Sequence, residues 1–383
     1  MKLSDIKMGD SAIIAKVHGT GKFRRRIIEM GFVRGQKVEV LIGAPLKDPI
    51  KYKIMDYEVS LRRNEAEFIE VVSINEKDSA IKSENYGTIE YDPISIAKKK
   101  GNTINIALVG NPNAGKTSLF NIASGKHEHV GNYTGVTVDA KEGNIDYKGY
   151  HLNIFDLPGT YSLTAYSPEE VFVRKHIMEE DPDLIINVVS ASNLERNLYL
   201  TTQLIDMDIP MVIALNMYDE LENSGAKLNY KELSNMLGIS IIPTQAKDGF
   251  TENSGISELF DAVISTYEGK NATTKHIHIN HGGDLQIAIN HINKLIKKSD
   301  NYQNHFSSRF FAVKLLENDK GAEDFVKTLS NADEILAYKE KTVPHIEAEL
   351  DEDCESAIIN AKYGFISGAL NETYTEPKRK NTG

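Results

Sequence analysis

Short, almost continuous apolar runs recur through the middle of the chain and alternate with amphipathic stretches. Such runs are typical of parallel strands that are buried on both faces. Four of them have the length of a strand: TINIALVG (103–110), LIINVV (184–189), PMVIALN (210–216) and ISIIPT (239–244). Between them, LERNLYLTTQLI (194–205) and KELSNML (231–237) have the spacing of helices. The alternation predicts βαβ units and a doubly wound α/β domain over residues 103–266.

The first 73 residues have a different pattern, in which apolar and polar residues alternate over short stretches. HGTGKFRRRIIEMGF (18–32) has helical spacing with Gly31 near its end, and APLKDPI (44–50), with two prolines, is expected to be a loop. Several short strands and one helix in so few residues predict a small β-barrel over 1–73. The predicted strands are QKVEVLI (36–42), DYEVSLRR (56–63) and EFIEVV (67–72).

From about residue 267 onward the pattern is helical, and no further strand is expected. The helical stretches include LQIAINHINKLIKK (285–298) and VPHIEAELDEDCESAIINAKYGFISGAL (343–370). They predict a helical domain over 267–375, behind the α/β domain. Residues 74–102 are polar, charged and aperiodic, so they are predicted to be a linker between the barrel and the α/β domain.

Charge and composition narrow the class of protein. The 383 residues suffice for two or three domains, and the net charge is −11, with +4 in residues 1–73 and −15 in the remainder. The acidic body argues against nucleic acid as the main partner, and the basic segment is either a solvated domain or docks on acidic surface elsewhere in the chain. Cys354 is the single cysteine, which excludes a disulfide framework and predicts a reducing, cytosol-facing location. The first residues lack an apolar signal region and no apolar run reaches ~20 residues, so we expect a soluble protein.

The stretch GNPNAGKT (110–117) has the spacing G-x-x-x-x-G-K-[ST], directly after a predicted strand and before KTSLFNIAS, which can open a helix. Glycines let such a loop turn its backbone N–H groups toward an anion, and the helix dipole favours a phosphate there. A Gly-rich turn without a ligand is the alternative. Lys116 is expected to contact the β- and γ-phosphates. The residues assigned to nucleotide binding in this loop are Gly110, Asn111, Pro112, Asn113, Ala114, Gly115, Lys116, Thr117 and Ser118.

The Gly-rich segment GNYTGVTVDAKEG follows the first predicted helix and carries Thr137. A threonine there can bind Mg²⁺ through its hydroxyl group while its backbone N–H reaches the terminal phosphate. Gly135 and Val136, which precede it, are also assigned to the nucleotide. A loop threonine without a ligand is the alternative.

The segment LNIFDLPGTYS places Asp156 at the end of a predicted strand and Gly159 three residues later. The carboxylate can hold a magnesium-bound water, and the Gly159 N–H can sense the γ-phosphate. A capping aspartate is the alternative. Together with the phosphate loop, this segment predicts a magnesium site formed by Thr117, Thr137 and Asp156.

The segments VIALNMYDE and PTQAKDG are candidates for the base. Asp219, three residues after Asn216, can accept hydrogen bonds from guanine N1–H and N2–H, which adenine does not offer. The Ala246 N–H is assigned to the guanine O6, and the stem of Lys247 is expected to lie along the base. Met217 takes part in the same motif and stands where a lysine would strengthen binding, so we expect modest affinity and fast GDP release. The order and spacing of all these segments indicate a guanine-nucleotide switch protein.

These motifs have a family resemblance. GNPNAGKT, VGNYTGVTVD, DLPGTYSL and NMYD resemble the Ras-like G domain of the ferrous iron transport protein B (FeoB) family. RFFAVKLLENDK and AKYGFISGAL resemble the helical domain that follows it there, while EMGFVRGQKVEVLIGAPLKDPI and SLRRNEAEFIEV resemble the small SH3-like FeoA protein. The sequence departs from the family pattern at Tyr133, Thr134 and Gln245.

The resemblance implies a membrane-embedded iron transport domain as partner, expected where the chain ends at EPKRKNTG. It therefore implies a cytoplasmic location at the inner face of the cell membrane. Either the chain is a piece of a longer protein or it is a naturally soluble form. Lys378, Arg379 and Lys380 suit the cytoplasmic edge of a membrane helix, although a charged tail explains them equally well.

Many small GTPases orient the attacking water with a glutamine directly after the DxxG glycine. Here that residue is Thr160, so side-chain general base catalysis is not visible. Similar G domains with asparagine at the position of Asn113 bind K⁺, which offsets charge in the transition state; a loop-stabilising side chain is the alternative. The residues assigned to catalysis are Asn113, Lys116, Thr137 and Gly159, with Asn113 also a ligand of K⁺.

The motifs thus predict slow, potassium-stimulated GTP hydrolysis with bound Mg²⁺, and the family resemblance implies that it is coupled to gating of ferrous iron uptake. A GTP-binding factor for RNA or ribosome assembly is one alternative, and a barrel that serves as a metal-responsive or protein-docking module is another. The histidine pairs His127/His129 and His276/His278 have the spacing of one strand face. They are either metal ligands or, in the plainer interpretation, exposed loop histidines.

Overall fold

The computed structural model forms two compact units, Met1–Thr103 and Ile104–Gly383, each with its own hydrophobic core. Several predicted features lie outside the described residues, namely the linker up to residue 101, Gly31, His127, Tyr133, Thr134, Gly135, Val136, Thr137, His276, Lys378, Arg379 and Lys380. The described residues are 1–18, 23, 27, 32, 36–43, 48–54, 57–73, 102–124, 128–131, 140–164, 167–251, 253–275, 277–302 and 307–376.

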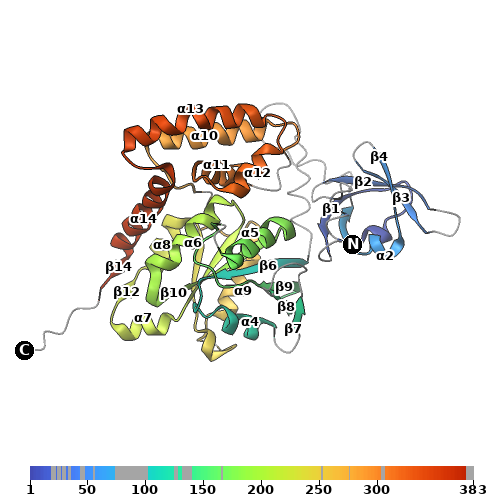
Figure 1. Ribbon diagram of the computed structural model, residues 1–383. Helices are drawn as coiled ribbons and strands as arrows, with labels where there is room; N and C mark the ends of the chain where they lie inside the picture. The colour runs from blue at the N-terminus through green and yellow to red at the C-terminus, as the bar shows by residue number, and fades with distance from the viewer. Residues whose placement is uncertain are drawn as a thin grey trace, which may run out of the picture. The chain divides into compact units, whose positions relative to one another are not determined.

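Within its described residues, the N-terminal unit has a five-stranded antiparallel sheet and the one-turn helices η1 (Leu3–Asp5) and α2 (Arg63–Ala66) (Figure 1). Phe23 and Ile27 are also helical, as the spacing of residues 18–32 predicts. Its strand order is β4-β3-β2-β1-β5. The predicted strands β2, β4 and β5 are confirmed, whereas β1 and β3 were not predicted. Strand β3 begins at the last residue of the expected proline loop and has only three inward residues, so its alternation is short. The bounds are β1 (Ser11–Val17), β2 (Lys37–Gly43), β3 (Ile50–Ile54), β4 (Tyr57–Leu61) and β5 (Ile69–Ser73).

The second unit is built on a seven-stranded mixed sheet of order β13-β11-β10-β6-β9-β8-β7 (Figure 1). Strand β10 pairs in parallel with β6 and β11, β11 pairs in parallel with β13, and β8 pairs antiparallel with β7 and β9. All four strands expected from apolar runs are present. The bounds are β6 (Thr103–Gly110), β7 (Glu128–Gly131), β8 (Ala140–Tyr147), β9 (Tyr150–Asp156), β10 (Leu184–Ser190), β11 (Met211–Asn216) and β13 (Ser240–Pro243).

The central strands are buried on both faces, which explains their continuous apolar sequence. On β6, Ile106 and Leu108 belong to the core beneath α4 (Lys116–Ser124) and α9 (Ile256–Tyr267), whereas Ala107 and Val109 belong to the core on the other face. The confirmed α/β architecture follows from this alternation. The other face is covered by α5 (Pro168–Glu180), α6 (Leu194–Asp206), α7 (Tyr218–Ser224) and α8 (Tyr230–Leu237), with the short 3₁₀ turn η2 (Ala191–Asn193). A second 3₁₀ turn, η3 (Ala246–Asp248), lies on the side of α4 and α9.

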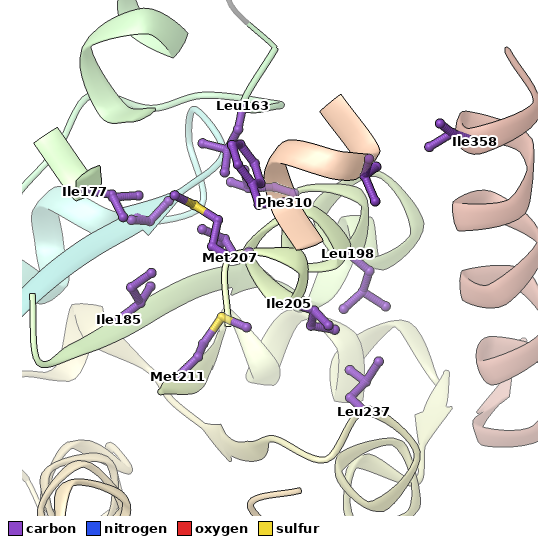
Figure 2. Packing of buried hydrophobic residues seen from close by; sticks show 14 of the residues in the cluster. Leu163, Ile177, Ile185, Leu198, Ile205, Met207, Met211, Leu237, Phe310 and Ile358 are labelled. Carbon is purple, nitrogen blue, oxygen red and sulfur yellow. The ribbon is translucent and has the colours of Figure 1, made fainter. Parts of the chain in front are cut away.

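Five helices follow, and they share one hydrophobic core with the second face of the sheet. Figure 2 shows Ile185 of the sheet and Leu198 of α6 in the same cluster as Phe310 and Ile358 from the helical region. The helices are α10 (Gly283–Lys298), α11 (Ser308–Leu316), α12 (Lys320–Lys327), α13 (Ala332–Leu350) and α14 (Cys354–Thr373).

The expectation that strands end near residue 267 is wrong in one place. The short strand β14 (Tyr374–Thr375) pairs antiparallel with β12 (Lys227–Leu228). Two residues carry no periodic signal, so only the return of the chain beside the α/β domain produces this pairing. Among the residues that the structure describes, no helix is both long and apolar enough to cross a bilayer.

Candidate nucleotide site

The phosphate loop connects β6 to α4, and its backbone needs glycine at two close approaches. A Cβ atom on Gly110 would lie 2.5 Å from the Val188 carbonyl oxygen of the neighbouring strand. A Cβ atom on Gly115 would lie 2.0 Å from the Asn216 Nδ2 atom, and Gly115 has a φ of +86°. Asn113 also has a left-handed φ, +64°, which asparagine tolerates better than most residues. The loop is therefore tightly wrapped, with Asn113, Thr117 and Ser118 exposed.

Lys116 and Asp156 meet at the foot of the loop. The Lys116 ammonium donates a short hydrogen bond to Asp156 Oδ1, and both side chains are less than a tenth exposed. Lys116 opens α4 while Asp156 ends β9, so the two predicted phosphate and magnesium residues come from separate elements to one point. A cation and an anion in contact also neutralise each other's charge in this buried place.

The DxxG segment lies against the phosphate loop. The Thr160 N–H donates to the Gly110 carbonyl at 3.1 Å, and a Cβ atom on Gly159 would be 3.0 Å from Pro112 Cα. Thr160 is buried, and its hydroxyl group donates to the Ser162 carbonyl at 2.7 Å. The side chain after the DxxG glycine is therefore committed to its own loop.

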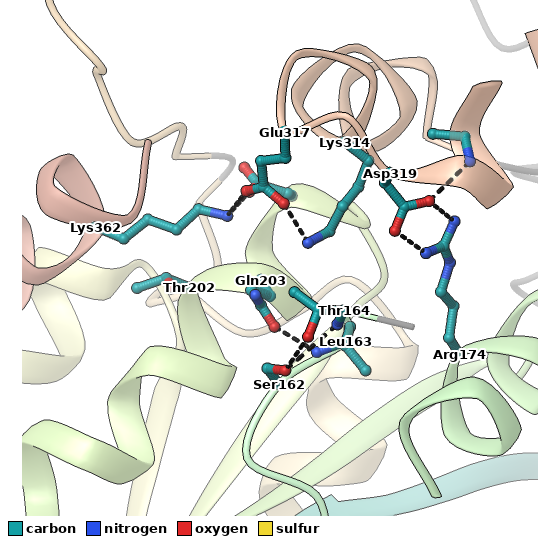
Figure 3. Close-up of polar contacts among 12 residues, drawn as sticks. Ser162, Leu163, Thr164, Arg174, Thr202, Gln203, Lys314, Glu317, Asp319 and Lys362 are labelled. Atoms are coloured by element: carbon teal, nitrogen blue, oxygen red, sulfur yellow. Dashed lines mark hydrogen bonds and ion pairs between the residues drawn. The ribbon is translucent and has the colours of Figure 1, made fainter. Parts of the chain in front are cut away.

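The residues that follow are tied to two helices. The Leu163 N–H donates to Gln203 Oε1 of α6 at 2.5 Å (Figure 3). The hydroxyl groups of Ser162 and Thr164 donate to the two carboxylate oxygens of Glu170, at 2.8 and 3.2 Å. Glu170 also closes the capping box at the start of α5. The segment after the DxxG motif is thus fixed to the N-terminal turn of α5.

Asn216 connects the phosphate loop to the loop after β13. Its side chain is 3% exposed; Nδ2 donates to the Ala114 carbonyl at 3.0 Å, and Oδ1 accepts from the Ala246 N–H at 3.0 Å. Sequence analysis assigned that N–H to the guanine O6, whereas here its partner is Asn216. The Thr244 hydroxyl group donates to the same Oδ1 at 3.4 Å. One buried amide therefore holds two separate loops in register.

Asp219 and Lys247 form an ion pair at the edge of this arrangement. The Lys247 ammonium donates a short hydrogen bond to Asp219 Oδ2, and this bond raises the pKa of Lys247. Asp219 lies in the first turn of α7, and Met217, the residue just before that helix, has a left-handed φ of +58°. The sulfur of Met217 accepts from the Ser190 hydroxyl group at 3.6 Å. Asp219 and Lys247, which are both predicted to contact the base, are therefore in contact with each other.

The described members of the predicted site gather at one edge of the sheet. Gly110, Asp156 and Asn216 are the last residues of β6, β9 and β11, and the loop of Ala246 and Lys247 follows β13. In α/β sheets, ligands bind at the carboxyl ends of such strands. The predicted residues Gly135, Val136 and Thr137 lie outside the described part, so their placement stays a prediction.

Several residues around the site were not predicted, namely Tyr161, Glu170, Arg196 and Gln203, and one of them, Arg196, contacts the predicted loop residue Asn111. Asn111 is buried and its Nδ2 donates to the Arg196 carbonyl at 3.4 Å, while the Arg196 guanidinium lies 3.9 Å from the centre of the Tyr161 ring. Glu170 could have been found, because Ser167 followed three residues later by a glutamate is a capping-box signature. Gln203 is one polar residue within an amphipathic helix and carries no such signal.

Three family models match the chain. The FeoA domain matches residues 1–73, "Ferrous iron transport protein B" matches residues 104–263, and the FeoB cytosolic helical domain matches residues 281–375. The matches follow one another in the order of the elements described above. Together they account for most of the chain.

Curated relatives match most of the chain. A Fe(2+) transport protein A/Fe(2+) transporter FeoB fusion protein of Porphyromonas gingivalis is 46% identical over 98% of this chain, which covers 47% of that protein. The Fe(2+) transporter FeoB of Methanocaldococcus jannaschii is 34% identical over 72% of this chain, which covers 40% of that protein. The chain therefore spans about half the length of the curated relatives that it matches.

Solved structures agree with the second unit. A GDP-bound variant of the S. thermophilus FeoB G-domain is 37% identical over 71% of this chain and all of that chain, with a TM-score of 0.64. A second S. thermophilus variant, bound to GMPPNP, is 38% identical over 70% of this chain and 99% of that chain, with a TM-score of 0.60. Both proteins hold guanine nucleotides, one a diphosphate and one a triphosphate analogue.

Proposed function

The chain belongs to the ferrous iron transport protein B family, with a FeoA domain ahead of its G domain, and we propose that it is a GTP-hydrolysing switch. Its partner in this proposal is the membrane-embedded domain of a ferrous iron uptake system, and its location is the cytoplasmic face of that membrane. The observation that carries the proposal is the convergence of Lys116, Asp156, Asn216 and Asp219 at one edge of the sheet.

The phosphates would lie on the loop of residues 110–118, where Lys116 and the backbone N–H groups face the anion. Asp156 and Thr117 supply the hard oxygen ligands that Mg²⁺ prefers, and Thr137 completes the predicted set. Magnesium, when bound, offsets the negative charge of the phosphates. Lys116 and Asp156 then each exchange their mutual ion pair for a contact with the nucleotide or its metal ion.

Guanine would be selected by Asp219. Its carboxylate is paired with the flexible, exposed Lys247 ammonium, so it can be offered to a base without breaking any packed contact. A base that takes the Ala246 N–H replaces the Asn216 oxygen as its acceptor. Adenine lacks the N1–H and N2–H donors of guanine. Bound adenine would therefore leave the Asp219 carboxylate without a partner, so ATP is rejected.

In this proposal, the residue after Gly159 does not orient the attacking water with its side chain. The Thr160 hydroxyl group is already bonded to the Ser162 carbonyl. Asn113 is exposed at the tip of the phosphate loop, and its amide oxygen suits K⁺. When bound there, K⁺ offsets charge that develops during phosphoryl transfer.

A conformational change of the DxxG segment on GTP hydrolysis would be transmitted to the helical region through α5. Glu170 holds the segment after the DxxG motif, and Arg174 lies one turn further along the same helix. The Arg174 guanidinium donates to both oxygens of Asp319 at 2.7 and 2.9 Å, across to the start of α12 (Figure 3). A movement of the DxxG segment can therefore reach the helical region through α5, which carries the contact of Glu170 and, one turn further along, that of Arg174.

The test is steady-state GTP hydrolysis by the full chain, with either K⁺ or Na⁺ as the monovalent cation. We expect slow hydrolysis in Na⁺ and a faster rate in K⁺. Asn113→Ala should lose the stimulation while keeping most of its GTP affinity, because Lys116 and the loop amides remain. Thr137→Ala should lose hydrolysis in both salts. Equal rates in the two salts would exclude the potassium mechanism, and hydrolysis of ATP at the same rate would exclude the guanine switch.

A further inference from the structure

The helical region carries a group of metal-ligating side chains that the nucleotide site does not use. Asp284 lies in the first turn of α10, while His345 and Glu349 lie on α13. One ligand atom from each of the three lies within 4.8 Å of the other two. Among the residues that the structure describes, these form the one such group of His, Cys, Asp and Glu side chains.

The backbone beneath this group is fixed by packing. Leu285, next to Asp284, is 2% exposed, and Ile346, next to His345, is 1% exposed, and both belong to the shared hydrophobic core. His345 and Glu349 are four residues apart, so they project from the same face of α13. The ligand-bearing positions are therefore held by buried neighbours, while the ligand side chains themselves are partly or fully exposed.

The three side chains are close without being bonded to one another. His345 Nε2 and Asp284 Oδ2 are 3.8 Å apart, beyond hydrogen-bond distance. A metal ion holds its ligand atoms roughly 3–4 Å apart, because metal–nitrogen and metal–oxygen bonds are about 2.0–2.2 Å long. Small rotations of exposed side chains bring the observed spacing to that value. A direct salt bridge would instead require His345 to be protonated.

We propose that Asp284, His345 and Glu349 bind a divalent transition-metal ion on the outer face of the helical region, with water as the remaining ligands. One imidazole and two carboxylates form a mixed nitrogen and oxygen set, which suits first-row ions such as Mn²⁺, Fe²⁺, Co²⁺ and Zn²⁺ better than it suits Ca²⁺. The two carboxylates neutralise the charge of the ion. Binding would also link the first turn of α10 to the last turns of α13. This site is separate from the proposed GTPase.

The test is a titration of the nucleotide-free, chelator-treated full chain with Co²⁺, followed by its visible absorption bands, and with Mn²⁺, followed by the loss of the free-ion electron paramagnetic resonance signal. Leaving out nucleotide removes magnesium-site binding. The variants are Asp284→Asn, His345→Gln and Glu349→Gln, which keep side-chain size. His151→Gln is the matched control, because His151 is an exposed histidine 2.7 Å from the Asp146 carboxylate with no third ligand.

We expect one saturable ion per chain. Each of the three variants should weaken the affinity for the ion by at least about tenfold, which is the effect of losing an outer partner of a metal ligand. His151→Gln should leave this affinity unchanged. GTP hydrolysis by all four variants should stay at the unmodified rate, so the outcome is independent of the proposed function. Titrations of the three variants that match the unmodified chain, or an equal loss in His151→Gln, would overturn the proposal.

Discussion

Two sets of lysine–carboxylate pairs are built on opposite sides of the same α/β unit. At the nucleotide site, Lys247 is 66% exposed and its partner Asp219 is 19% exposed, and both are carried by residues that follow strand ends. Beneath the helical region, Lys362 is 0% exposed and Asp206 is 1% exposed, and both are carried by packed helices. The residue types are the same, and their surroundings differ.

The buried set is a continuous network. Lys362 lies 2.9 Å from Asp206. It also lies 3.7 Å from Glu317, which in turn pairs with Lys314 at 2.5 Å (Figure 3). Burial lowers the pKa of Lys362, but the facing Asp206 and Glu317 carboxylates outweigh it and leave that pKa above its usual value. Burial lowers the pKa of Lys314. The network therefore favours one fixed arrangement of α6, α11 and α14.

The position of a lysine–carboxylate pair in the fold therefore decides whether it suits ligand binding or a fixed structural contact. A pair on loops can give up its partner to a ligand at little cost, because water and the ligand replace the lost contact. A pair between packed helices has no replacement, so separating it leaves a buried charge without a partner. The first arrangement suits binding and the second suits a fixed docking geometry.

Lys362→Ala should have the largest effect. It removes the cation that Asp206 and Glu317 share, so that, among the residues that the structure describes, Glu317 keeps only Lys314 and Asp206 keeps only Arg309, 4.0 Å away. Breaking a buried pair by removing one partner typically costs about 3–5 kcal/mol of unfolding free energy. Urea unfolding of the full chain measures this. Lys148→Ala is the control, because the ion pair of Lys148 with Asp261 is exposed; it should leave the unfolding curve unchanged. Equal curves for the two variants would contradict the contrast between buried and exposed pairs.

Asp219→Asn should weaken GTP binding by about 2–4 kcal/mol, the scale of an unpaired polar group in a desolvated site, and leave unfolding almost unchanged. It should also gain affinity for xanthosine nucleotides, whose base has a carbonyl oxygen in place of the guanine 2-amino group and can accept a hydrogen bond from the asparagine amide. Equilibrium binding with fluorescent nucleotides measures both. Glu220→Gln, on the same helix turn, is the matched control and should bind GTP normally. Unaltered GTP affinity in Asp219→Asn would remove the base assignment.

His281 borders the buried network and gives it a pH dependence. Burial lowers the pKa of His281 from 6.5 to about 4, and the Lys362 and Arg309 charges act in the same direction against Asp206. The unfolded chain therefore takes up a proton first, so the unfolding free energy should fall by about 2–3 kcal/mol as pH falls from about 6.5 to about 4. His281→Gln should flatten this part of the curve. A slope that the substitution leaves unchanged would assign the effect to other groups.

Deletion of residues 1–73 should have the smallest effect. This segment has its own core of inward residues, including Tyr52 and Ile69, so we expect it to fold alone and its removal to leave GTP turnover nearly unaltered. Turnover measured at low and high salt tests this, since weak docking of a +4 segment on an acidic body is screened by salt. A tenfold change in turnover, or an excised segment without β structure by circular dichroism, would contradict this independence.

Much of the candidate nucleotide site could be predicted from short motifs, because its residues are close together in the sequence. GNPNAGKT fixes a turn, a lysine and a helix start within eight residues, and Asn216 and Asp219 are three residues apart. Each motif follows an apolar strand, so its place at the sheet edge follows from the strand direction. The partner that Asn216 takes, the Ala246 N–H, was not predictable, because 30 residues separate them.

The sequence by itself determined the order of the elements and the α/β sheet, and it predicted the phosphate-loop and base-loop residues, because periodicity and short motifs act over a few residues. Only the tertiary structure decided that Arg174 meets Asp319, 145 residues away, that Lys362 lies between Asp206 and Glu317, and that Asp284 approaches His345 and Glu349. A charged residue within a helix has the same local signal whether it faces water or a partner. Its partner is set by how the helices pack, which no local pattern records.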